Sequence, residues 1–311
     1  MPVHPISFTI PPNKVVDRIP TKTRITAAIV PGDTSTYIYK TEADYYKGYQ
    51  DSYFGITMKK SGWDCMRHYE IMANGCIPYF EGGVDAIPKN TMTLFPKDII
   101  VKTNDLYERV WQKQAHALDE AEERALRSHI EDLLAHTRLH LTTTSIVDYI
   151  LSASGFDPRA VGRVLFLSGS TDPDYLRCVT LIGFKAVFGS RCHDYPKVAH
   201  IYQDYGGDVS RLYGRGMTYS KTVPPSHESR EDAYDATVVH DIVNRAYDVI
   251  IYGSYHRGTP LLDTVSKVYK PEELIFLCGE DCDWFSNCET HDCALKRDAF
   301  SKCNVFIREL A

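Results

Sequence analysis

Tyr53-Phe-Gly-Ile-Thr-Met-Lys-Lys-Ser-Gly62 continues into Trp63-Asp-Cys-Met-Arg-His-Tyr-Glu-Ile-Met72 and ends with Ala73-Asn-Gly-Cys-Ile-Pro-Tyr-Phe80. Its two ends predict short strands over residues 52–58 and 76–80, because both are rich in aromatic and β-branched side chains. Residues 65–74 predict a helix between them, with Asp64 as its N-cap and Gly75 as the residue that ends it. A strand–helix–strand unit of this kind is typical of an α/β domain with a mostly parallel sheet.

The rest of the chain continues the alternation of strands and helices. Further strands are expected at residues 24–31, 163–168, 186–188, 247–252, 273–278 and 304–308. Further helices are expected at residues 41–51, 104–136, 145–153, 175–184, 233–245 and 261–268. Small residues, glycine and proline interrupt the pattern at Leu151-Ser-Ala-Ser-Gly-Phe-Asp-Pro158. This break predicts two domains, residues 1–152 and 153–311, with a ligand cleft at the carboxyl ends of their strands.

The polar residues of the first segment indicate phosphate binding. At about 100° per residue, Arg67, Glu70 and Asn74 share one face of the predicted helix. A helix N-terminus favours anions, and Lys59, Lys60 and Arg67 would balance the charge of a departing diphosphate. Glu70 would accept hydrogen bonds from ribose hydroxyls. The alternative is an ordinary amphipathic helix with a solvated Arg67–Glu70 pair.

The same segment resembles the exostosin-like glycosyltransferases. The resemblance rests on Gly62-Trp-Asp-Cys-Met-Arg-His-Tyr-Glu70 and Gly75-Cys-Ile-Pro-Tyr-Phe80, and it extends to such proteins of giant DNA viruses and microbes. It implies a GT-B fold, with two doubly wound Rossmann-type domains facing a cleft, and metal-independent sugar transfer. It also implies that Arg67 faces the diphosphate and Glu70 the ribose. Ile71 departs from the family's pattern, in which alanine follows the glutamate.

The resemblance assigns residues 1–152 to nucleotide-sugar binding and residues 153–311 to an acceptor-type domain. In GT-B enzymes the donor domain normally comes last, so a circularly permuted domain order is expected here. The predicted donor-binding residues are Lys59, Lys60, Gly62, Trp63, Arg67 and Glu70, with His256 and Arg257 from the facing domain. For His256 the alternative is a hydrogen-bonded loop histidine, and for Arg257 a surface ion pair.

Four loops of the second half follow predicted strands, at residues 168–177, 191–197, 253–258 and 278–283. An inverting transfer needs a base that takes the proton of the acceptor hydroxyl. The chemically suitable residues are Asp174, His193, Asp194, Glu280 and Asp281. Asp174 and Asp281 are the favoured catalytic candidates, and the alternative for Asp174 is to cap the helix that follows it.

Composition limits the other functions. The formal net charge of −6 gives no electrostatic footprint for nucleic acid. The apolar runs are too short to span a bilayer, and no secretory signal is recognisable, so a cytoplasmic location is expected, in the host cytoplasm if the protein is viral. The nine cysteines are then expected to be thiols. The expected ligands are a UDP- or GDP-sugar and a glycan or glycoprotein acceptor, with no cofactor.

Two metal sites and one non-enzymatic role remain as alternatives. Asp281-Cys-Asp283 is a DxD sequence, which GT-A glycosyltransferases use to hold a divalent cation. Zinc ligands are possible at Cys278, Cys282, Cys288, His291 and Cys293, but the spacing lacks paired C-x2-C knuckles, so no metal site is expected. A non-catalytic nucleotide- or glycan-binding module would keep Arg67 and Glu70 but lack a base.

Overall fold

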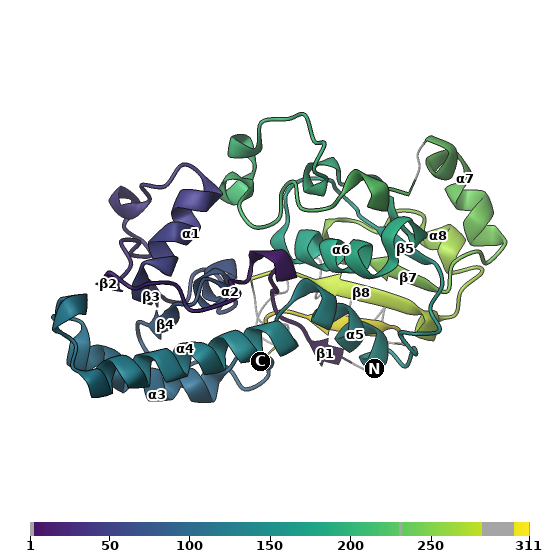
Figure 1. The fold of residues 1–311 in the computed structure, drawn as a ribbon. Coiled ribbons are helices and arrows are strands. Elements are labelled where there is room, and N and C mark those ends of the chain that lie inside the picture. The colour runs from purple at the N-terminus through teal and green to yellow at the C-terminus, as the bar shows by residue number, and fades with distance from the viewer. Residues whose placement is uncertain (1–2, 230–231, 282–301, 311) are drawn as a thin grey trace.

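The computed structural model describes residues 3–229, 232–281 and 302–310. Within these ranges the chain forms two parallel sheets with helices around them (Figure 1), which confirms the α/β class. The large sheet has the order β1-β9-β8-β7-β5-β6. Its strands are β1 (Val3–Pro5), β5 (Val164–Leu167), β6 (Cys192–Tyr195), β7 (Val249–Tyr252), β8 (Leu274–Cys278) and β9 (Asn304–Ile307). The small sheet consists of β2 (Arg24–Thr26), β3 (Ser52–Thr57) and β4 (Ile77–Phe80), in that order.

The unit predicted from residues 52–80 is confirmed. Helix α2 (Met66–Ala73) connects β3 to β4, which pair in parallel. Tyr69 and Met72 of α2 are fully buried in the core that the helix shares with the sheet. Gly75 follows the helix with φ +64, the left-handed conformation that glycine adopts without strain. Helix α1 (Glu42–Gln50) precedes β3 as expected, capped by the Thr41 side chain.

The single helix predicted over residues 104–136 is wrong, because the structure has two. Helix α3 (Lys97–Val110) ends at Trp111, and α4 (Glu120–His140) begins after Asp119. The Asp119 carboxylate accepts the N–H groups of Ala121 and Glu122 at 2.9 and 2.8 Å, and the Glu122 side chain accepts the N–H of Asp119. This capping box starts a new helix inside a sequence that has helical composition throughout.

The large sheet is covered on both faces, as its apolar strands predict. Helices α5 (Thr143–Ala153) and α6 (Tyr175–Phe188) pack on the face that carries Phe166, while α7 (Asp232–Val243) and α8 (Leu262–Val265) lie over the face that carries Leu165 and Leu167. The strand predicted at residues 186–188 is wrong, since these residues form the last turn of α6. Helix α6 is buried almost all round, so its sequence has the continuous apolar run of a buried strand.

Strand β1 comes from the beginning of the chain but lies in the large sheet. Val3 pairs with Val305 and Pro5 with Ile307, so the strands nearest the two ends of the sequence are parallel neighbours. Helix α5, whose last turn contains the predicted boundary at residue 152, packs against α6 of the same sheet. The boundary itself stays a prediction. In the described part of the chain, no helix has the length and apolarity that crossing a membrane requires.

Candidate functional site

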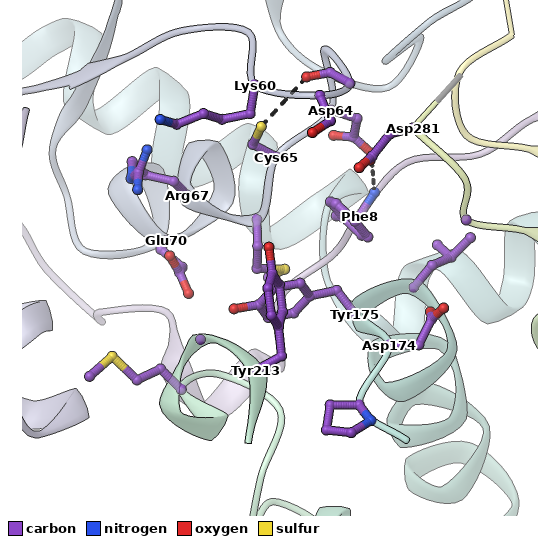
Figure 2. A pocket seen from close by; sticks show the side chains of 18 of the residues that line it. Phe8, Lys60, Asp64, Cys65, Arg67, Glu70, Asp174, Tyr175, Tyr213 and Asp281 are labelled. Atoms are coloured by element: carbon purple, nitrogen blue, oxygen red, sulfur yellow. Dashed lines mark hydrogen bonds between the residues drawn. The ribbon is translucent and has the colours of Figure 1, made fainter. Parts of the chain in front are cut away.

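A cavity of about 850 Å³ lies between the small and the large sheet (Figure 2). The start of α2, the loop before it and the segment from β2 to α1 form one wall, and loops that follow β5, β6, β7, β8 and β9 form the other. Its cationic lining residues are Lys60, Arg67, Arg215, Arg257 and Arg308. Its carboxylates are Asp64, Glu70, Asp174 and Asp281, and its tyrosines are Tyr37, Tyr39, Tyr45, Tyr175 and Tyr213. The cavity therefore lies at the carboxyl ends of parallel strands, where α/β proteins bind ligands.

The start of α2 has no side-chain cap. Asp64, predicted to be the N-cap, instead accepts the N–H of Phe8 at 2.8 Å and the hydroxyl of Tyr69 at 2.6 Å. Cys65 takes the N-cap position without capping the helix, and it lines the cavity. The first N–H groups of α2 are therefore left without a side-chain acceptor beside the cavity, which favours an anion there.

Arg67 lines the cavity without a carboxylate partner among the described residues. Its guanidinium contacts the hydroxyl of Tyr37 at 3.4 Å and lies 5.7 Å from the centre of that ring. The Arg67 Nε atom is buried and has no hydrogen-bond partner within the described chain. The alternative of a solvated Arg67–Glu70 pair does not describe this helix, because Glu70 is only 4% exposed. The Glu70 carboxylate is close enough to act on the charge of Arg67, but a partly buried guanidinium whose Nε lacks a hydrogen-bond partner is still a ready site for an anionic ligand.

Glu70 lies in the wall of the cavity and is held by two hydroxyl groups. Its carboxylate accepts the hydroxyl of Tyr45 at 2.6 Å and that of Thr218 from the large-sheet side. Burial raises the pKa of Glu70 above its usual value, although both hydrogen bonds act in the opposite direction. Each carboxylate oxygen accepts one of these bonds and keeps a second lone pair for a ligand hydroxyl.

The predicted donor residues before α2 divide into two groups. Lys60 and Gly62 line the cavity, whereas Lys59 and Trp63 do not. The Lys59 ammonium lies 5.2 Å from the centre of the Trp63 ring, so these two side chains contact each other. A side chain at Gly62 would collide with the Glu309 carboxylate, so glycine at this position leaves room for Glu309 against the loop.

Arg308 and Glu309, which sequence reasoning did not identify as site residues, join the two walls. The buried Arg308 guanidinium donates to the Asp64 carbonyl on the small-sheet side. On the large-sheet side it donates to the carbonyls of Gly279 and Glu280 and to the Asp281 carboxylate. Glu309 accepts the N–H groups of Trp63 and Asp64 at 3.1 and 2.9 Å. The only signal in the sequence was a charged pair directly after an apolar strand.

Asp174 is both a helix cap and an ion-pair partner. Its carboxylate accepts the N–H of Arg177 at 3.0 Å, which caps α6, and the Nε–H of Arg257 at 2.7 Å. His256 lies 3.8 Å from the same carboxylate but does not line the cavity. Burial alone would raise the pKa of Asp174, but the Arg177 N–H and the neighbouring cations lower it below its usual value. A carboxylate held in this way is a weak base.

Two other carboxyl and imidazole candidates lie away from the cavity. Asp194 pairs with the buried Lys185 ammonium at 2.8 Å and accepts the Tyr202 hydroxyl at 2.7 Å. His193 bonds to the hydroxyl of Tyr247 and to Asp235. Neither residue lines the cavity. Both side chains instead form hydrogen bonds with other residues of the large-sheet half.

Asp281 remains the accessible carboxylate of the β8 loop, with its side chain 57% exposed. Its DxD partner Asp283 and the zinc candidates Cys282, Cys288, His291 and Cys293 lie outside the described residues. Across residues 3–229, 232–281 and 302–310, no group of three His, Cys, Asp or Glu side chains could hold a metal ion. Cys278 is disulfide-bonded, so the expectation of a thiol is wrong there. Among the described residues, Cys65, Cys76, Cys178, Cys192 and Cys303 are free thiols, as expected.

The Asp64 carboxyl predicts a pH-dependent stability. Burial raises its pKa from 3.8 to about 7, against the opposing effects of the Arg308 charge and the Tyr69 hydroxyl. Because the pKa is higher in the folded than in the unfolded chain, the stability from this group is complete below pH 3.8 and is lost as the pH rises towards 7. The free energy of unfolding of the wild type, relative to that of Asp64→Asn, should therefore fall by a few kcal/mol between pH 5 and pH 8 in urea titrations.

The matched control for this measurement is Asp204→Asn, because Asp204 is exposed. Its free energy of unfolding should differ from that of the wild type by the same amount at both pH values. The assignment to Asp64 is wrong if the wild type and Asp64→Asn change in parallel with pH.

Comparison of the chain with protein-family models, with curated proteins and with solved structures finds no match. The fold and the chemistry of the cavity are therefore the only observations that bear on function.

Proposed function

We propose that this chain is a glycosyltransferase that moves a sugar from a UDP- or GDP-sugar to a glycan hydroxyl, with inversion and without a metal ion. The observation that carries the proposal is the unpaired Arg67 guanidinium beside the uncapped start of α2, in a cavity between two parallel sheets. These groups together suit a diphosphate, because a guanidinium and backbone N–H groups both bind phosphate oxygens. Lys60 lines the same wall and adds a second positive charge.

The other groups of the cavity suit the remaining parts of a nucleotide sugar. Glu70 keeps lone pairs for ribose hydroxyls, and the five lining tyrosines offer rings on which a base or a sugar can stack. A cavity of about 850 Å³ has room for a ligand of this size. The proposed location is the cytoplasm. The five free thiols of the described residues support this location, whereas the disulfide at Cys278 does not.

The proposal includes a GT-B arrangement with permuted domain order. The small sheet with the donor motif comes first along the chain, and the large sheet supplies the facing loops. The neighbouring positions of β1 and β9 support the permutation, since they bring both ends of the sequence to one edge of the large sheet. Because these strands are parallel, an ancestral connection between them would have needed a crossover segment.

Asp281 is the base in this proposal. The acceptor oxygen attacks the anomeric carbon as its proton passes to the Asp281 carboxylate, and the bond to the diphosphate breaks with its electron pair leaving on the phosphate oxygen. Each of Asp174 and Asp281 is bound by an arginine, Arg257 and Arg308 respectively. Asp281 suits the role of base better because its side chain is 57% exposed, whereas that of Asp174 is 6% exposed and also caps α6. The role of Asp174 is then to hold Arg257 at the cavity.

Substitution distinguishes these two roles. Asp281→Asn should lower the rate of transfer by roughly 10²- to 10⁴-fold and leave nucleotide affinity unchanged. Asp174→Asn should instead lower the free energy of unfolding by up to about 1 kcal/mol, because asparagine still caps α6 but loses the ion pair with the partly exposed Arg257. Transfer is measured as release of nucleoside diphosphate, and stability by urea titration. Transfer at the wild-type rate in Asp281→Asn would show that the base assignment is wrong.

The proposed function is tested by thermal unfolding of the chain with UDP, GDP and their hexose conjugates. A ligand that binds only the native state raises the unfolding temperature, and at 100 times its dissociation constant it stabilises by about 2.7 kcal/mol. Stabilisation followed by sugar transfer in EDTA is the expected result. Binding without turnover of any sugar nucleotide would identify a binding module instead. No stabilisation at millimolar concentration overturns the proposal.

A further inference from the structure

One segment of the large-sheet half reaches across to the small sheet. Residues 213–218 follow β6 in the chain and lie between α1 and α6 in Figure 1. Tyr213, Gly214, Arg215 and Met217 line the same cavity as Arg67, and Figure 2 places Tyr213 on the side of the cavity opposite Arg67. This segment therefore contributes to the cavity from the wall that faces α2.

Thr218 attaches the end of this segment to the small-sheet side. Its N–H donates to the Glu42 carboxylate at the start of α1, and its hydroxyl donates to Glu70 of α2. The Tyr46 hydroxyl lies 2.8 Å from the same Thr218 oxygen. Thr218 is fully buried, so these hydrogen bonds are protected from water. The segment is thus bound to both helices that flank the proposed donor site.

The backbone conformation of this segment is held in an uncommon form. Gly214, Arg215 and Gly216 have φ values of +56, +59 and +68, and Thr218 has +74. A side chain at Gly214 would lie 1.9 Å from the Tyr175 hydroxyl, so only glycine fits there. Arg215 and Thr218 are not glycine, and such residues adopt this conformation only where their surroundings impose it. The contacts of Thr218 and Gly214 supply that constraint and set the position of Arg215.

Arg215 brings a further guanidinium to the cavity. Its side chain is exposed, and its charge is close enough to the Asp208 carboxylate to help lower the pKa of that group. Arg211, two residues before this segment, lies 3.4 Å from the same Asp208 carboxylate but differs because it does not line the cavity. An arginine held by a constrained backbone, in a cavity that Arg67 also lines, suits an anion with several oxygens.

We propose that Arg215 binds the diphosphate of the donor from the large-sheet side, so that the anion is held between Arg215 and Arg67. This inference rests on the proposed function and adds a binding residue to it. Its consequence is that the diphosphate joins the two halves of the cavity, because Arg67 belongs to the small-sheet side and Arg215 to the other. The part of the affinity that Arg215 contributes should then depend on the phosphate groups and not on the nucleoside.

The test measures binding of UDP, GDP, uridine, guanosine and inorganic pyrophosphate by calorimetry at low salt. Arg215→Ala should weaken the binding of the preferred nucleoside diphosphate and of pyrophosphate about tenfold, and leave the nucleoside unaffected. Arg215→Lys should recover part of the loss, because lysine keeps the charge but not the planar fork. Arg211→Ala is the matched control and should bind as the wild type does.

Each outcome decides the inference. Wild-type affinity for the diphosphates in Arg215→Ala overturns it and leaves the proposed function standing. An equal loss for nucleoside and diphosphate also overturns it, since Arg215 would then act on the shape of the cavity. If the wild type binds neither UDP nor GDP, the inference and the proposed function fail together. The unfolding temperature of unliganded Arg215→Ala should equal that of the wild type, because the side chain is exposed.

Discussion

Replacement of Arg67 by alanine is expected to weaken the binding of UDP or GDP by about 10- to 100-fold. The guanidinium lies beside the start of α2, partly buried and without a carboxylate partner in the described chain. A hydrogen bond to a charged group contributes about 1.5–3 kcal/mol, and each 1.4 kcal/mol corresponds to a factor of about ten in affinity. Calorimetric titration of UDP and GDP into the wild type and Arg67→Ala measures the change.

Arg124→Ala is a suitable control, because Arg124 is a highly exposed residue of α4 whose nearest carboxylate is 4.0 Å away. It removes one positive charge from the same half of the chain and should bind the nucleotides as the wild type does. Because Arg67→Ala also loses the attraction between Arg67 and the buried Glu70 carboxylate, its free energy of unfolding is measured alongside its affinity. Unchanged affinity in a folded Arg67→Ala would place the diphosphate elsewhere in the cavity, and similar losses in both variants would indicate a general charge effect.

Replacement of Arg308 by methionine is expected to destabilise the protein by about 3–5 kcal/mol. Arg308 is 1% exposed, and its guanidinium lies 4.7 Å from the Phe8 ring. Methionine fills part of the space but leaves the carbonyls of Gly279 and Glu280 without their donor. It also leaves the Glu309 carboxylate buried without its nearest positive charge. Urea titration measures the loss as a change in the free energy of unfolding.

Arg245→Met provides the matched comparison on the surface. Arg245 pairs with Glu273 and donates to the Val268 carbonyl at 2.6 Å, but its side chain is half exposed. Its loss should cost at most about 1 kcal/mol, because water can replace the partner. Arg308→Lys should lie between the two, since lysine keeps the charge without the five donors of arginine. Equal losses for Arg308→Met and Arg245→Met would show that the buried network adds no stability.

The sequence predicted the fold well where the signal was local. The strands and helix of residues 52–80 follow from apolar runs, a helical period and Gly75, all within one short segment. The error at residues 186–188 arose because a helix buried on nearly all sides has no polar face to reveal its period. The error between α3 and α4 arose because Asp119 and Glu122 form a capping box inside a sequence that favours helix on both sides.

The candidate site was predictable in its chemistry but not in its contacts. Lys60, Arg67 and Glu70 of the motif line the cavity together with Asp174, Arg257 and Asp281 of the second half. The changed role of Asp64 could not be read from its neighbours, because its carboxylate accepts the N–H of Phe8, 56 residues away. Arg308 is 244 residues from Asp64, and no local pattern marks such a contact.

This long separation has a consequence for how the protein is made. During synthesis, residues 24–80 leave the ribosome early and carry the whole of the small sheet. The loop around Asp64 can take its final conformation only after Arg308 and Glu309 have been synthesised, because these residues provide its buried hydrogen-bond partners. Strand β1 likewise can pair only after β9, its neighbour in the large sheet, has been synthesised. We therefore expect the small sheet to form before the cavity does, and nucleotide binding to become possible only after residue 309 has left the ribosome.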